Sequence, residues 1–186
     1  MTKIGDAKIL IVATDGFEQS ELLQPRKDLS EMGATVRVAS IEEGEIKAWD
    51  KDHWGETVQV DLTVSSANAD DYDAVVLPGG QINPDKLRVE RDVLDLIRRF
   101  DEQGKVVAAI CHAPWLLIEA GLAEGRTLTS YQSIRTDLRN AGATVVDQEV
   151  ARDGNIITSR NPGDLDAFSK AIAEAIEEDK DTRNAA

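Results

Sequence analysis

The stretch 105-KVVAAICHAPW-115 joins a short apolar run to a polar turn and the start of a helix. Residues 105–110 have the β-branched, apolar composition of a buried strand. Pro114 suits the first turn of a helix, which we expect over residues 113–120. A buried strand that runs directly into a helix is the repeating unit of folds in which helices cover a parallel sheet.

The same alternation of strand and helix continues in both directions from this stretch. The pattern predicts strands at 7–14, 34–40, 72–80 and 126–130, a hairpin at 45–64, strands within 143–160 around a turn at 153–154, and helices at 18–32, 85–104, 131–141 and 163–178. Because the strands are nearly all apolar, helices must cover both faces of a mostly parallel sheet. We therefore predict a flavodoxin-like three-layer α/β sandwich, formed by a single domain over residues 1–186 with a disordered tail at 179–186.

Composition excludes several classes of partner and cofactor. The formal charge of −14 argues against binding nucleic acid or an anionic membrane, and no apolar run approaches the roughly 20 residues that span a bilayer. A lone cysteine cannot form an internal disulfide, so we expect a cytoplasmic protein. His53 has no second His or Cys nearby, and the one Gly-Gly pair lacks the spacing of a phosphate loop. We expect neither a metal nor a cofactor.

That lone cysteine, Cys111, lies where the strand at 105–110 meets the next helix. A strand, a nucleophile and a helix in this order form a nucleophile elbow. The partial positive charge of a helix N-terminus favours the thiolate, so we expect a thiol pKa below its usual range. His112 is placed to serve as the base. The alternative is a buried thiol that packs as a small hydrophobic side chain.

Four motifs in order carry a family resemblance: LPGG at 77–80 with NPDKLR at 83–88, AAICHAPWLL at 108–117, LTSYQSIRTDLRNAGA at 128–143 and ITSRNPGDLDAF at 157–168. Over roughly residues 7–176 the chain resembles the DJ-1/PfpI superfamily, in its intracellular protease I branch. The resemblance implies Cys111 as nucleophile and His112 as catalytic histidine. It also implies Glu18 as a protonated acid against the sulfur, and leaves Glu21 a structural residue.

The resemblance extends to the loop that contains the glycine pair. In that branch an acid from this loop of a neighbouring subunit orients the histidine, which points to Asp85 and to at least a dimer, although Asp85 also suits a helix N-cap. Gly79 and Gly80 either form a plain turn or aim N–H groups, with that of His112, at an oxyanion. Tyr131 is a substrate-facing phenol or a half-buried core residue.

Two classes of function follow from these residues. The first is a stress-related cysteine hydrolase acting on a small-molecule or peptide substrate, either a peptidase or a deglycase of glyoxal and methylglyoxal adducts; both chemistries need the same groups. The second is a redox-sensing or chaperone-like stress protein that uses an oxidisable Cys111. A sensor needs only the thiolate, whereas turnover needs a proton carrier, so His112 favours the enzyme.

Overall fold

A seven-stranded sheet forms the centre of the computed structural model, which describes residues 4–184 and side chains through residue 179. Its order is β11-β12-β8-β7-β1-β3-β6, and only the edge strand β11 runs antiparallel to its neighbour. The strands are β1 (Lys8–Val12), β3 (Thr35–Ser40), β6 (Leu62–Thr63), β7 (Ala74–Leu77), β8 (Val106–Ile110), β11 (Val150–Asp153) and β12 (Ile156–Ser159). The predicted mostly parallel sheet is confirmed.

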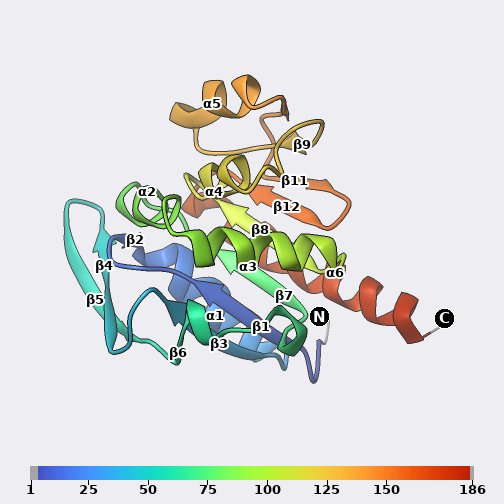
Figure 1. The fold of residues 1–186 in the computed structure, drawn as a ribbon, viewed down its shortest axis with the longest axis horizontal. Coiled ribbons are helices and arrows are strands. Elements are labelled where there is room, and N and C mark those ends of the chain that lie inside the picture. The colour runs from blue at the N-terminus through green and yellow to red at the C-terminus, as the bar shows by residue number, and fades with distance from the viewer. Residues whose placement is uncertain (1–3, 185–186) are drawn as a thin grey trace.

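Helices cover this sheet on both faces (Figure 1). One face carries α1 (Gln19–Glu31) and α6 (Leu165–Asn184), and the other carries α3 (Arg91–Glu102), α4 (Pro114–Glu119) and α5 (Arg135–Asn140). Strand β1 serves both layers, because its side chains alternate: Ile9 and Ile11 join the α1–α6 core, whereas Leu10 and Val12 join the opposite core. The predicted three-layer sandwich is confirmed.

Two small sheets flank the central one. Strand β2 (Phe17–Glu18) pairs with β4 (Glu45–Asp50), which forms the expected hairpin with β5 (His53–Gln59) and stands at one edge of the molecule in Figure 1. Strands β9 (Thr127–Leu128) and β10 (Thr144–Val145) pair near α5. Short 3-10 turns complete the connections: η1 (Val64–Ser66), η2 (Ala69–Asp71), η3 (Gln132–Ile134) and η4 (Pro162–Asp164).

The helix expected over 85–104 is two helices, which corrects the sequence interpretation. Helix α2 (Ile82–Leu87) lies against β2 and α4, and the chain then turns through an exposed Val89 before α3 begins on the face of the sheet. Asp85 lies inside α2, so it does not cap the following helix. The helix expected over 131–141 likewise begins as the 3-10 turn η3.

At the C-terminus, α6 is longer than the predicted 163–178. Residues 179–184 of the expected tail continue this helix, and residues 185–186 lie outside the described part of the chain. None of the described helices combines the length and the apolar composition that crossing a membrane requires.

Candidate active site

Cys111 occupies a strained turn directly after β8. Its φ is 64°, in the left-handed region that side chains other than glycine rarely adopt. Its amide donates a hydrogen bond to the Ser159 carbonyl (3.0 Å), and its own carbonyl accepts one from the Tyr131 amide (2.8 Å). These bonds on two sides hold the strained conformation. The predicted nucleophile elbow is therefore present, with the cysteine only 6% exposed.

The loop after β7 passes very close to this elbow. A Cβ atom at Gly79 would lie 2.6 Å from Cys111 Cβ and 2.6 Å from Glu21 Oε2, closer than such atoms can approach. Gly80 follows with a φ of 79°. Glycine at 79 thus allows a carboxyl group and the thiol to meet beneath the loop.

A buried asparagine fixes that loop. Asn83 Nδ2 donates to the carbonyls of Pro78 (2.9 Å) and Gly79 (3.2 Å), and its Oδ1 accepts from the Thr14 amide (2.8 Å). The loops after β1 and β7 are therefore tied together at the carboxyl edge of the sheet. Asn83 begins the NPDKLR motif, but we assigned it no role from the sequence, because an amide that bridges two loops leaves no periodic signal.

The carboxyl group next to the thiol belongs to Glu21, which corrects the expectation for Glu18. Glu21 is fully buried, its Oε2 accepts a hydrogen bond from the Gly79 amide (2.9 Å), and its side chain interacts with Cys111. Glu18 is half-buried, and its Oε1 accepts from Ser20 Oγ (3.2 Å).

The geometry of α1 explains why Glu21, and not Glu18, lies next to the thiol. Glu18 precedes the helix as its N-cap residue and, with Asp50, lines a cavity of about 550 Å³. Glu21 lies on the buried face of the helix with Pro25 and Leu29, each four residues further along. Spacing of this kind places side chains on one face. In the sequence, the position of this glutamate on the apolar side of the predicted helix was therefore the signal that could have identified Glu21.

Burial dominates the electrostatics of the acid and the thiol. Burial, followed by the charge of Glu18, raises the pKa of Glu21 to about 8, against the lowering effect of its hydrogen bonds. Burial, followed by the charge of an ionised Glu21, also raises the pKa of Cys111, against the lowering effect of the Gly80 and His112 amides. The expected low thiol pKa is therefore not supported. At pH 7 Glu21 holds a proton, which removes its charge from beside the sulfur.

His112 bridges the thiol and a hydroxyl group. Its Nδ1 lies 3.1 Å from Cys111 Sγ, and its Nε2 lies 3.1 Å from Ser133 Oγ. The ring stacks on Tyr131, with centroids 4.7 Å apart, and meets Trp115 edge-on at 5.3 Å. Burial lowers the pKa of His112, so the ring is neutral at pH 7 and able to accept a proton.

The remaining predicted site residues differ in their exposure to solvent. Tyr131 is 42% exposed. The Gly79 amide is bonded to Glu21, whereas the amides of Gly80 and His112 face the sulfur. Asp85 is exposed on α2, and no described interaction joins it to His112. Among the described residues, no three His, Cys, Asp or Glu side chains group as a metal site requires.

Comparison with known proteins finds relatives over most of the chain. Residues 7–175 match the model of the DJ-1/PfpI family. The chain belongs to the DJ-1/PfpI family. It is 42% identical over 169 residues to "Deglycase PfpI" of Pyrococcus furiosus, covering 91% of this chain and 99% of that protein. It is 40% identical over 164 residues to "General stress protein 18" of Bacillus subtilis, covering 88% and 94%.

The solved structures agree on the fold. The crystal structure of Drosophila melanogaster DJ-1beta superposes with a TM-score of 0.83 at 32% identity, covering 93% of this chain and 95% of that one. The family resemblance read from the four sequence motifs is confirmed.

Proposed function

We propose that this DJ-1/PfpI family member is a cysteine-dependent deglycase, which hydrolyses adducts of glyoxal or methylglyoxal from amines. The observation that carries the proposal is the position of the Cys111 thiol. It lies at a strained elbow beside His112 and the buried Glu21, where burial lowers the pKa of His112 and raises that of Glu21 to about 8. The name of the Pyrococcus furiosus relative supports the choice of reaction.

The proposed reaction begins when His112 Nδ1 takes the thiol proton and the sulfur attacks the carbonyl carbon of the adduct. Negative charge then develops on the carbonyl oxygen. The Gly80 and His112 amides, which face the sulfur, are close enough to this region to stabilise that charge. His112 gives its proton to the amine as the C–N bond of the neighbouring carbinol carbon breaks; the hydroxyl of that carbon becomes an aldehyde, and its proton passes to the oxyanion. The carbon–sulfur bond then breaks to return the thiol, and water hydrates the released dicarbonyl.

Restricted access to the thiol supports a small substrate group over an extended peptide. Cys111 and His112 are 6% and 8% exposed, so only a narrow part of a substrate reaches the sulfur. A two- or three-carbon adduct satisfies this limit, whereas a peptide bond is flanked by chain on both sides.

The redox-sensing alternative requires an exposed thiolate. The thiol is buried, and burial raises its pKa, so this alternative lacks the feature on which it depends. A reducing cytoplasm keeps such a thiol available for turnover, and we propose that location.

The proposed assembly is at least a dimer. Asp85 lies exposed in the first turn of α2, so its carboxylate is accessible to a neighbouring copy. We propose that its carboxylate stabilises the charge on His112 of that neighbour when the imidazole holds two protons. A twofold axis would make this contribution reciprocal.

Turnover on a defined substrate panel tests the proposed function. The panel contains methylglyoxal adducts of N-acetyl-arginine, N-acetyl-lysine and N-acetyl-cysteine, together with fluorogenic peptides. We expect release of the free amino acid derivatives, abolished in Cys111→Ser, with little cleavage of peptides. Equal adduct release by wild type and Cys111→Ser would contradict the proposal.

A further inference from the structure

The reaction proposed above uses only one nitrogen of the His112 ring. The second nitrogen, Nε2, lies 3.1 Å from Ser133 Oγ, on the 3-10 turn η3 that precedes α5. Ser133 lies within the motif at 128–143, but we assigned it no role from the sequence. Its hydroxyl is the group that the described chain offers to Nε2 as a hydrogen-bond partner.

The segment of residues 130–135, which contains Ser133, is attached to the elbow at two further points. The Tyr131 amide bonds the Cys111 carbonyl at 2.8 Å, and the Tyr131 ring stacks on the imidazole with an interplanar angle of 25°. The position of Ser133 relative to His112 therefore does not depend on a single contact.

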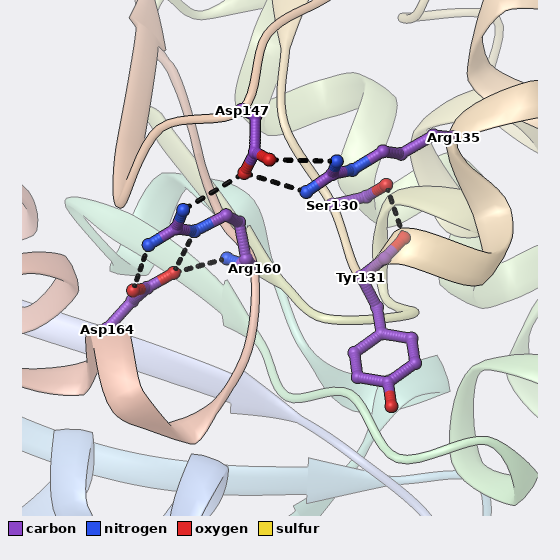
Figure 2. A network of polar contacts seen from close by, with 6 residues as sticks. All are labelled: Ser130, Tyr131, Arg135, Asp147, Arg160 and Asp164. Atoms are coloured by element: carbon purple, nitrogen blue, oxygen red, sulfur yellow. Dashed lines mark hydrogen bonds and ion pairs between the residues drawn. The ribbon is translucent and has the colours of Figure 1, made fainter.

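A network of ion pairs fixes the far end of the same segment (Figure 2). Arg135 binds both carboxylate oxygens of Asp147 (2.8 and 3.1 Å), and Arg160 binds the same aspartate at 2.9 Å. Arg160 also forms a two-pronged contact with the buried Asp164. Because Arg160 directly follows β12, the network ties the segment to the central sheet.

We propose that Ser133 is a positioning residue for His112, whose Oγ accepts a hydrogen bond from Nε2–H and so keeps the lone pair of Nδ1 facing the Cys111 thiol. A neutral imidazole has one N–H, and the partner of one nitrogen decides which nitrogen carries it. With the proton on Nδ1, the ring could not accept the thiol proton from its observed position 3.1 Å away. The kinetic consequence of this inference rests on the proposed function.

A hydroxyl suits this position because it leaves the ring neutral. The groups around the ring are the thiol, the Ser133 hydroxyl and the aromatic rings of Tyr131 and Trp115. A carboxylate at Nε2 would favour the doubly protonated ring, whereas a hydroxyl accepts the Nε2 proton without adding a charge. The serine therefore orients the neutral His112, whereas the charge of a neighbour's Asp85 would favour the doubly protonated ring that forms when His112 takes the proton.

Nitrogen-15 NMR of the histidine rings tests the inference without any substrate. The chain has two histidines, and His53→Gln identifies the His112 signals. At pH 7 we expect the wild type to be protonated on Nε2 and not on Nδ1. Ser133→Ala is expected to lose this preference and give a mixture of both forms, and Ser133→Thr, which retains a hydroxyl, is expected to restore it.

Ser130→Ala provides a matched control, because Ser130 Oγ donates to the Tyr131 carbonyl in the same segment and has no described hydrogen bond to His112. It should preserve the wild-type tautomer. A wild-type ring protonated on Nδ1, or an unchanged tautomer in Ser133→Ala, would overturn the inference.

Kinetics separate this inference from the proposed function. With an active substrate, Ser133→Ala should lower kcat about tenfold, the size expected for one hydrogen bond, with little change in KM. If Ser133→Ala retains full kcat while Cys111→Ser is inactive, the role of Ser133 is refuted and the proposed function stands. If no substrate turns over, the proposed function fails and the NMR result still decides the role of Ser133.

Discussion

At the scale of single residues, Glu21 makes the stability of the fold depend on pH. Its ordinary pKa of 4.5 is raised to about 8 in the folded protein, chiefly by burial. Below pH 4.5 the group is neutral in both the folded and unfolded states. As the pH rises from 4.5 to about 8, the unfolded chain releases this proton while the folded chain keeps it. The contribution of protonated Glu21 to the free energy of unfolding is therefore lost progressively across this window.

Glu21→Gln tests this dependence. Because glutamine does not titrate, the free energy of unfolding of the wild type should fall relative to the variant by about 1.4 kcal/mol per pH unit between pH 5 and 8. Urea denaturation at pH 5, 6.5 and 8 measures it. Glu31→Gln, at the exposed end of the same helix, should follow the wild type. Parallel curves for wild type and Glu21→Gln would show that this carboxyl is ionised in the fold.

At the scale of elements, the site depends on how closely the loop after β7 approaches α1 and the elbow. Gly79→Ala would place a methyl group 2.6 Å from both Cys111 Cβ and Glu21 Oε2. Because this methyl group would also lie 2.7 Å from the Ile110 carbonyl oxygen, which belongs to the backbone, we expect a loss of about 1–3 kcal/mol in the free energy of unfolding. We also expect a large loss of activity, since the acid and the thiol are forced apart. Thermal denaturation and the turnover assay measure the two effects.

Gly5→Ala is the matched control for this substitution. A Cβ atom at Gly5 would meet nothing within 4 Å, and the residue needs no left-handed backbone. Its stability and activity should stay close to those of the wild type. An equally mild effect at Gly79 would mean that the loop after β7 adjusts freely and does not constrain the site.

The sequence predicted the elements better than it predicted the site. Strands such as β8 were identified because a run of apolar residues is a local signal, and the elbow followed from the position of Cys111 at its end. The break between α2 and α3 was missed because it depends on where the sheet edge lies. Glu21 was interpreted as structural and Ser133 was given no role, since their partners are distant along the chain.

At the scale of the whole molecule, the proposed site takes one residue, Asp85, from a second chain. Asp85 and His112 belong to one motif set in the sequence, yet no described interaction joins them within the chain. If Asp85 acts across a twofold interface, then a mixed dimer of Cys111→Ser and Asp85→Asn chains contains one site with both residues intact.

To test whether Asp85 acts across the interface, the two variants are dissociated, mixed in equal amounts and reassembled, and the activity is measured. Random pairing should restore about a quarter of wild-type sites, above the average of the two impaired parents. If Asp85 acts within its own chain, mixing creates no intact site and activity stays at that average. A fully active Asp85→Asn parent would remove Asp85 from the mechanism.

The left-handed backbone at Cys111 has a consequence for how this protein could be engineered. A residue with a Cβ in this conformation costs the fold about 1–3 kcal/mol, which glycine would not. A library of variants ranked only by heat resistance would therefore tend to enrich glycine at position 111. The most heat-resistant clones would then be inert, so any such screen must also select for a reactive thiol.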